Sequence, residues 1–166
     1  MKKTYYFFIL FIVPFLARCQ PQSLDEKLAG LLKGSVETIN CNQATALISN
    51  GSNVKVYDTR STEEFNVSAI KNADFIEYDN FDPLTIKLPN KTDTLIFYCT
   101  VGYRSEKITE KLQKEGYTHV SNFYGGIFSW KNEGGVVVNS KNQATDKVHT
   151  YNKKWSQWLL KGEKVW

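Results

Sequence analysis

The chain has 166 residues, of which 42% are hydrophobic, 14% aromatic and 23% charged. This composition is typical of one ordinary globular domain and excludes disordered and collagen-like chains. The net charge of +4 comes largely from residues 1–18, and the rest of the chain holds 18 basic against 17 acidic residues. Such a nearly neutral domain gives no reason to expect nucleic acid as a partner. Three cysteines are too few for a disulfide scaffold.

The N-terminal segment has the pattern of a secretory signal. Lys2 and Lys3 precede an apolar run over residues 5–17, which is shorter than the roughly 20 residues that span a bilayer. The run ends in Leu16-Ala17-Arg18-Cys19, which resembles the lipobox of bacterial lipoproteins, although that family prefers Gly, Ala or Ser at the position of Arg18. The resemblance implies that residues 1–18 are a signal peptide and that Cys19 becomes the lipidated first residue.

A lipid anchor predicts an extracytoplasmic location at the cell envelope, in the periplasm or attached to a membrane, without a spanning segment. A simple secretion signal and a retained signal anchor are the two alternatives. Residues 19–34 are predicted to be a tether, with a short amphipathic piece from Leu24 to Leu32.

From residue 36 onward, short apolar runs alternate with helical spacing. Strands are predicted at residues 36–39, 54–57, 73–76, 95–98 and 120–123. Helical segments are predicted after Asn40, at residues 63–65 and at residues 105–115, and residues 79–94 are an irregular connection. This order favours a parallel α/β sheet, and the unbroken apolar run at 95–98 indicates a strand covered on both faces.

Residues 135–166 form a C-terminal extension with an aromatic stripe. The spacing of Tyr151, Trp155, Trp158 and Leu159 predicts an amphipathic helix that ends near Gly162. We expect this stripe to pack back onto the domain. The alternative is a docking surface for a partner protein at the Trp155/Trp158 helix, because exposed tryptophan clusters are typical anchors.

The segment after residues 95–98 carries the clearest chemical signal. A cysteine lies there between a buried strand and a helix, at the carboxyl end of the strand, where ligands bind in α/β sheets. A loop that curls around one side chain and enters a helix points backbone N–H groups inward, which favours an anion or a thiolate. We therefore expect Cys99 to be a catalytic nucleophile in an anion-binding loop of Thr100, Val101, Gly102, Tyr103, Arg104 and Ser105.

Three residues of this loop have predicted roles of their own. Gly102 permits the tight curl because it adopts positive φ without steric cost. The guanidinium of Arg104 suits an oxyanion, and Ser105 is placed to cap the helix or to donate to the sulfur. The alternative for Cys99 is a buried free cysteine at a strand end. Cys41 has neither glycine nor arginine nearby, so a structural role is predicted for it.

Four motifs in order, within residues 35–134, resemble a single rhodanese domain. They are Val56-Tyr57-Asp58-Thr59-Arg60 with Glu63-Glu64-Phe65, then Ser68-Ala69-Ile70-Lys71-Asn72-Ala73, then Cys99 with Gly102 and Arg104-Ser105, and last Tyr124-Gly125-Gly126-Ile127 with Trp130. The resemblance implies a rhodanese-like α/β fold, with a central parallel sheet flanked by helices. The C-terminal helix is expected as an addition to that fold.

Two departures from the family pattern affect the predicted site. The family usually has Gly-His-Ile-x-Gly-Ala where this chain begins with Ser68 and Ala69 and has Asn72 in place of the second glycine. Asparagine tolerates the left-handed backbone better than most residues, so the fold is expected to survive. Thr100 stands where many members have arginine, so the pocket is expected to hold one cation fewer.

The resemblance implies a sulfurtransferase that works through a Cys99 persulfide. The Cys99 thiolate would take sulfur from a small anionic donor such as thiosulfate, and a thiol or cyanide would accept it. The N–H groups of residues 100–104 would hold the negative charge, and Arg104 would bind the oxyanion end of the donor. No metal or organic cofactor is implied, and His119 and His149 lack the spacing of metal ligands.

Two other functions are alternatives to sulfur transfer. One is a non-catalytic rhodanese-like module that binds a partner or carries sulfur at the cell envelope. The other is phosphatase or arsenate reductase activity, but those relatives use a longer loop than the six residues from Cys99 to Arg104.

Asp58 and Arg60 are candidates for orienting the cysteine loop. Asp58 ends a predicted strand beside that loop, by analogy with the family. For Arg60 we favour a simpler role, an ion pair with Glu64 that fixes a turn, because the two residues are four apart.

Overall fold

The structure, a computed structural model, describes residues 22–50 and 53–166. The predicted signal peptide and Cys19 lie outside the described residues. Among the described residues, no helix is long and apolar enough to cross a membrane.

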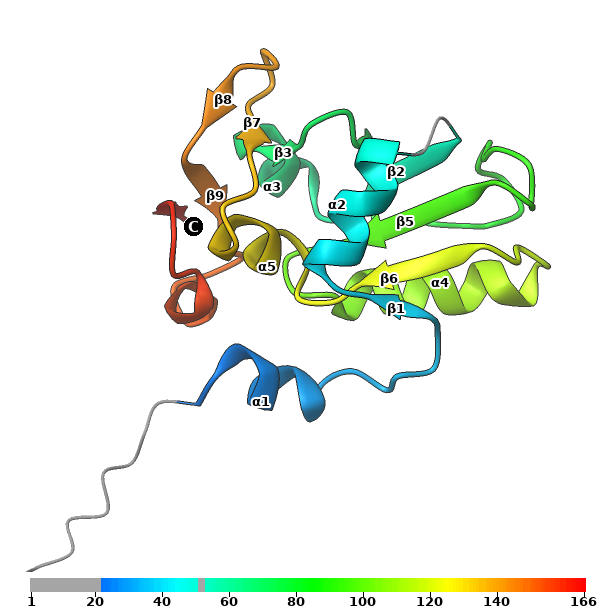
Figure 1. Cartoon of the computed structure of the whole chain (residues 1–166), viewed down its shortest axis with the longest axis horizontal. Helices are drawn as coiled ribbons and strands as arrows, with labels where there is room; N and C mark the ends of the chain where they lie inside the picture. The colour runs from blue at the N-terminus through cyan, green and yellow to red at the C-terminus, as the bar shows by residue number, and fades with distance from the viewer. Residues whose placement is uncertain (1–21, 51–52) are drawn as a thin grey trace, which may run out of the picture.

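A five-stranded parallel sheet forms the centre of the domain (Figure 1). Its strands lie in the order β1-β6-β5-β2-β4, and every neighbouring pair is parallel, as the alternating pattern predicted. The strands are β1 (Thr38–Ile39), β2 (Val54–Asp58), β4 (Asp74–Phe75), β5 (Thr94–Tyr98) and β6 (Val120–Phe123). Since all five strands run in one direction, their carboxyl ends meet at one edge.

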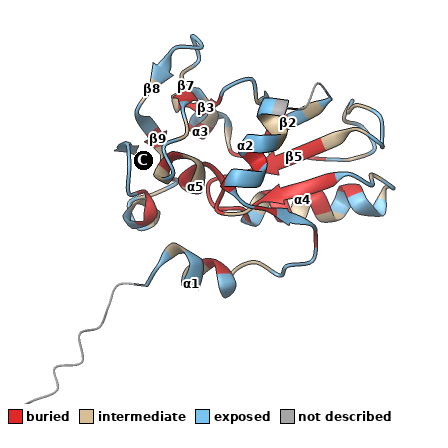
Figure 2. Cartoon of the chain, viewed as in Figure 1, coloured by how far each residue is buried: buried red, intermediate tan, exposed pale blue. Residues whose placement is uncertain are grey.

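Helices cover both faces of this sheet, α2 (Cys41–Asn50) and α4 (Tyr103–Lys114) lying on opposite sides (Figure 1). Leu95 and Phe97 of β5 pack with Ile108 and Leu112 of α4. The alternate residues Ile96 and Tyr98 belong to the other core cluster, with residues of α2 and of α5 (Gly126–Asn132). The central strands are therefore buried on both faces (Figure 2), which explains the unbroken apolar run.

Local side-chain hydrogen bonds fix where two of the helices begin. Asn40 accepts a hydrogen bond from the Gln43 N–H (3.0 Å) and so caps α2, as predicted. Ser61 and Glu64 form a capping box at the start of α3 (Thr62–Val67). The helix α4 begins at Tyr103, earlier than the predicted residue 105, because Gly102 makes the preceding turn.

Short strands beside the central sheet were absent from the sequence prediction. An antiparallel sheet contains β3 (Ala69–Ile70), β7 (Val137–Val138) and β8 (Ala144–Thr145), in that order. A separate parallel pair joins β9 (Lys147–His149) to β10 (Glu163–Val165). Four of these strands, β7 to β10, lie in the C-terminal extension, where the aromatic stripe predicts a helix and no strand.

The described part of the predicted tether packs onto the domain. A capping box between Ser23 and Glu26 starts α1 (Leu24–Ala29), and Leu28 is fully buried in the core. The carboxylate of Glu106 then accepts hydrogen bonds from the Lys33 and Gly34 N–H groups (3.1 and 2.8 Å). This segment is thus part of the folded domain.

The C-terminal helix is shorter than predicted. It is a single 3-10 turn, Trp155–Trp158, because Tyr151 takes a left-handed backbone (φ 64°) and the chain is extended again at Leu159. Trp158 and Leu159 are buried and pack back onto the domain as expected, whereas Trp155 is half-buried and Tyr151 is exposed. Gly162 does not end a helix. It allows a close approach of the backbone, since a Cβ there would lie 2.8 Å from the Asp146 carbonyl oxygen.

Candidate active site

Cys99 follows β5 at the carboxyl edge of the sheet, with its side chain almost fully buried. The N–H of Gly102 donates to its Sγ across 3.1 Å, and among residues 100–104 this is the one backbone N–H that the structure shows bonded to the sulfur. Gly102 has φ 104°, and a Cβ there would lie 3.3 Å from the Phe123 carbonyl oxygen. A fixed N–H that points at the sulfur, at the start of α4, stabilises negative charge on it.

The cysteine loop is supported from behind by the start of α5. The N–H groups of Ile127 and Phe128 donate to the carbonyl oxygens of Cys99 and Thr100 (3.0 and 3.2 Å). Gly126 comes so close that an added Cβ would lie 2.1 Å from the Cys99 carbonyl oxygen. The Gly125-Gly126 motif is therefore needed to let α5 hold the loop.

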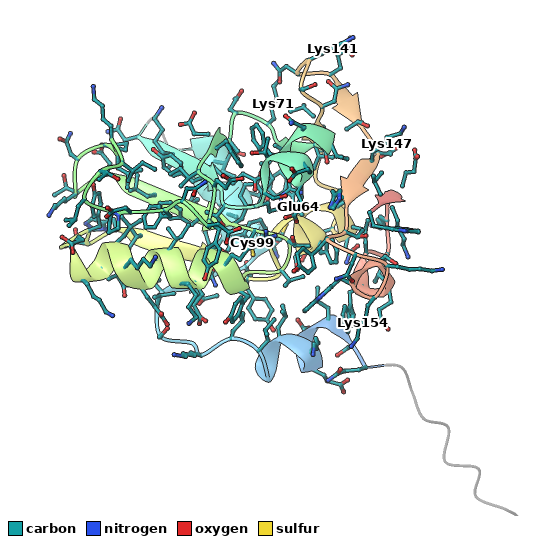
Figure 3. The ribbon with its side chains drawn as sticks, turned by 180° about the vertical axis from the view of Figure 1, so that it is seen from behind. Glu64, Lys71, Cys99, Lys141, Lys147 and Lys154 are labelled. Atoms are coloured by element: carbon teal, nitrogen blue, oxygen red, sulfur yellow. The ribbon has the colours of Figure 1, made fainter. Side chains whose placement is uncertain are left out.

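Arg104 is tied to Glu64 beside the cysteine. Its two terminal nitrogens donate to the two carboxylate oxygens of Glu64 across 2.7 and 2.9 Å. The hydroxyl of Thr100 donates to Glu64 (2.6 Å) and accepts from Arg104 (2.8 Å). Figure 3 shows Glu64 and Cys99 together in the middle of the molecule. Glu64 thus links the cysteine loop to α3.

This pair is held in its charged form. Burial alone would raise the pKa of Glu64, but hydrogen bonds and charge from Arg104, helped by Thr100, lower that pKa to about 2. Burial opposes the charge of Arg104 as well, yet hydrogen bonds to Glu64 and the nearby Cys99 raise the pKa of Arg104 above its ordinary value. The positive charge of Arg104 is therefore largely balanced by Glu64.

Asp58 and Arg60 form a second ion pair, and both side chains are completely buried. The shortest contact joins the guanidinium of Arg60 to the Asp58 carboxylate at 2.7 Å, and Arg60 also donates to the Ser68 carbonyl oxygen. The Tyr98 hydroxyl donates to Asp58 (2.7 Å) and accepts from the Ile70 N–H (3.0 Å). The predicted Arg60–Glu64 pair is replaced by this one, because Arg60 precedes the α3 cap and the four-residue rule applies only within a helix.

The other residues that the sequence analysis considered have the following partners and surroundings. Ser105 donates to Asn122 (2.7 Å), and the helix cap is Gly102, so neither role predicted for Ser105 is the one observed. Cys41 is buried at the start of α2, and burial, with the charge of Glu133, raises the pKa of its thiol. His119 is exposed. Within the described ranges, no three His, Cys, Asp or Glu side chains gather as a metal site would require.

A pocket of about 330 Å³ opens over the cysteine loop. The loop contributes Cys99, Thr100, Val101, Tyr103 and Arg104, whereas Gly102 and Ser105 of the predicted anion-binding loop do not line the pocket. The other lining residues are Leu31, Tyr78, Asp79, Tyr151 and Trp155, which sequence analysis did not place at the site. These five, like Glu64, come from distant parts of the chain, and no local motif connects them to Cys99.

Comparison with known proteins agrees with this geometry. The family model for the rhodanese-like domain matches residues 41–133, which is more than half of the chain. The chain belongs to the rhodanese-like domain family. In this rhodanese-like domain Asn72, which replaces the usual glycine, does take the left-handed backbone (φ 64°).

Individual relatives carry different names. The chain is 31% identical over 111 residues to a tRNA uridine(34) hydroxylase of Prochlorococcus marinus. The match covers 61% of this chain but only 35% of that protein. It is 30% identical over 123 residues to rhodanese-like domain-containing protein 17 of Arabidopsis thaliana, covering 66% of this chain and 78% of that one. The human single-domain sulfurtransferase shares the fold, with 23% identity, a TM-score of 0.52, and coverage of 59% of this chain and 97% of that one.

Proposed function

We propose that this protein is a sulfurtransferase that carries sulfane sulfur as a persulfide on Cys99. The observation that carries the proposal is the Gly102 N–H, which points at the Cys99 Sγ from 3.1 Å at the start of α4. It supplies a fixed partial positive charge for a thiolate before the reaction and for a persulfide after it. Membership of the rhodanese-like family agrees with this chemistry.

The reaction has two steps. With thiosulfate as donor, the Cys99 thiolate attacks the outer sulfur, the S–S bond of the donor breaks, and sulfite leaves with the bonding electron pair. The enzyme is left with a Cys99 persulfide anion. In the second step cyanide or a thiolate attacks the terminal sulfur of this persulfide, and the Cys99 thiolate is released.

Arg104 serves this reaction chiefly through the loop. Both of its terminal nitrogens already bind Glu64, and one of them also binds Thr100. The predicted contact with the oxyanion end of the donor is therefore weaker than a free guanidinium would give. The pair instead fixes the loop between α3 and α4.

Intact mass measurement tests the persulfide directly. After incubation with excess thiosulfate or an organic thiosulfonate, the full chain is expected to gain one sulfur atom that a reducing thiol removes. The variant Cys99→Ser should gain none, and Cys41→Ser should gain it as the wild type does, because Cys41 is buried in the core and does not line the pocket over Cys99. A wild-type protein that gains no sulfur from either donor would contradict the proposal.

The second step of the reaction distinguishes the sulfurtransferase from the non-catalytic alternative. The reference is the rate at which cyanide or a thiol takes sulfur from a small-molecule persulfide in solution. If Cys99 is loaded but loses its sulfur to these acceptors no faster than that, the protein is a carrier. Steady formation of thiocyanate that is lost in Cys99→Ser supports the enzyme. Turnover of an aryl phosphate or arsenate instead would favour the phosphatase or reductase alternative.

We also propose that the protein is attached at the cell envelope through a lipid on Cys19. The lipobox-like segment Leu16-Ala17-Arg18-Cys19 after the apolar run supports this location. The folded domain would then lie beside the membrane, with α1 close to the anchor in sequence.

A further inference from the structure

The walls of the pocket above Cys99 are mainly apolar and aromatic. Six of the residues that line it are Leu31, Tyr78, Val101, Tyr103, Tyr151 and Trp155. Its volume of about 330 Å³ is within the range of pockets that hold small organic ligands, roughly 300–1,000 Å³. A small inorganic anion would contact few of these walls.

Three of these lining residues lie outside residues 41–133, the part of the chain that the family model matches. Leu31 follows α1, and Tyr151 and Trp155 belong to the C-terminal extension. The two flanking segments are joined to each other, since Trp158 donates from its indole nitrogen to the Gln22 carbonyl oxygen (3.1 Å). Figure 1 shows the 3-10 turn of the extension next to α1. The flanks therefore enclose the site together.

The two aromatic residues of the extension are supported in different ways, and Tyr151 is 57% exposed. Tyr151 adopts φ 64°, which non-glycine residues seldom do, and its N–H donates to the His149 Nδ1 (3.1 Å). Its ring lies 5.6 Å from the guanidinium carbon of Arg104. Trp155 packs against the buried Trp158, with ring centroids 4.9 Å apart. The contact with Trp158 therefore preorganises the Trp155 side of the pocket to bind a ligand.

The pocket also lacks a free positive charge. Of the described residues that line it, two are charged: Arg104, which is balanced by Glu64, and Asp79. The lysines labelled in Figure 3, Lys71, Lys141, Lys147 and Lys154, are exposed on the outside and do not line the pocket. A dianion such as thiosulfate therefore meets no unpaired cation there.

We infer that the preferred sulfur donor is an organic sulfane compound whose apolar or aromatic group lies against Tyr151 and Trp155. This inference rests on the proposed function, because it concerns the same persulfide on Cys99. With an organic persulfide, the Cys99 thiolate attacks the terminal sulfur, the S–S bond of the donor breaks, and the organic thiolate leaves with the electron pair. With a thiosulfonate, the leaving group is the organic sulfinate.

Three donors test this inference on the full chain: thiosulfate, methanethiosulfonate and benzenethiosulfonate. The two thiosulfonates carry the same charge and differ in the organic group, whereas thiosulfate carries a second charge. For each donor, the rate constant for sulfur loading of Cys99 is divided by the rate constant of the same donor with a simple thiol. These normalised rate constants are then compared between donors. We expect a preference of about tenfold for benzenethiosulfonate over methanethiosulfonate, and thiosulfate should be the poorest donor.

Variants locate the source of this preference. In Trp155→Ala and in Tyr151→Ala the ratio between the two thiosulfonates should fall to about threefold or less, because benzenethiosulfonate loses more contact area than methanethiosulfonate does. Trp166→Ala is the matched control, because this tryptophan is exposed and does not line the pocket. Thermal unfolding shows which variants are folded, and Trp155→Phe, which keeps an aromatic ring, should retain most of the preference.

The outcomes separate the two proposals. If thiosulfate loads Cys99 at least as well as benzenethiosulfonate, or if both alanine variants keep the wild-type ratio, the donor class inferred here is wrong and the sulfurtransferase proposal stands. If no donor loads Cys99, the proposed function itself is wrong.

Discussion

Glu64 and Arg104 are 40 residues apart in the chain and form a two-pronged ion pair beside the catalytic candidate Cys99. The Glu64 side chain is 2% exposed and that of Arg104 is 18% exposed, so water screens the pair only in part. The pair joins α3 to the cysteine loop and cancels the one positive charge that the loop brings to the pocket. Stability and donor choice thus depend on the same contact.

The ionisation of Glu64 predicts how stability depends on pH. Its pKa is about 2 in the folded protein against an ordinary value of 4.5. A lowered folded pKa stabilises the fold fully above the unfolded value, and this contribution is lost as pH falls from about 4.5 to about 2. It amounts to about 3 kcal/mol.

Urea unfolding at a series of pH values measures this dependence. Glu64→Gln should be destabilised by about 3 kcal/mol at neutral pH, with a flatter loss of stability below about pH 4.5. The exposed Glu37→Gln should follow the wild-type curve. Equal slopes in Glu64→Gln and wild type would show that Glu64 does not titrate in this way.

The close approach of α5 to the cysteine loop is tested at two glycines. Gly126→Ala would put a Cβ 2.1 Å from the Cys99 carbonyl oxygen, so it should cost about 3 kcal/mol or more and slow sulfur loading. Gly134 also has positive φ (95°), but nothing lies within 4 Å of its added Cβ. Gly134→Ala should therefore cost only about 1 kcal/mol and leave loading unchanged.

Denaturant unfolding and intact mass measure the two effects. Similar losses in both glycine variants would mean that backbone conformation alone, rather than the contact with Cys99, makes Gly126 necessary.

The buried Asp58–Arg60 pair predicts a large loss when one partner becomes neutral. Asp58→Asn leaves the fully buried Arg60 without its counter-charge and should cost about 3–5 kcal/mol. Tyr98→Phe removes the hydrogen bond donated to Asp58 and the one accepted from the Ile70 N–H, and should cost about 1–3 kcal/mol.

An exposed pair provides the comparison for Asp58. Glu163 lies 3.8 Å from Lys147 on the surface, and Glu163→Gln should change the free energy of unfolding by less than about 0.5 kcal/mol. A loss in Asp58→Asn as small as this one would show that the buried pair adds little to stability.

Lipidation of Cys19 predicts a label on the mature protein. When the full chain is produced in bacteria fed an alkyne-tagged fatty acid, the tag should appear on the protein and the protein should sediment with membranes. Cys19→Ser should lose the tag, whereas Cys41→Ser should keep it, because Cys41 is buried in the folded domain. A tag that persists in Cys19→Ser would disprove the anchor.

Several parts of the fold follow directly from local sequence. The residues 95–98 are apolar throughout because both faces of β5 are covered, and this pattern is visible without a structure. Asn40 and Gly102 are also readable, since one supplies a side-chain cap and the other a positive φ. The aromatic spacing of residues 151–159 was misleading, because periodicity shows which side chains are buried together but does not require a helix.

By itself, the sequence determined the alternation of strands and helices that favours a parallel sheet, the position of Cys99 at a strand end and the glycine that curls the loop, because each of these depends on neighbours within a few residues. Only the tertiary structure decided that Glu64 pairs with Arg104, that Arg60 turns back to Asp58, and that Tyr151 and Trp155 line the pocket. A buried charge takes the partner that comes nearest in space, and a pocket is enclosed by segments that meet only after folding.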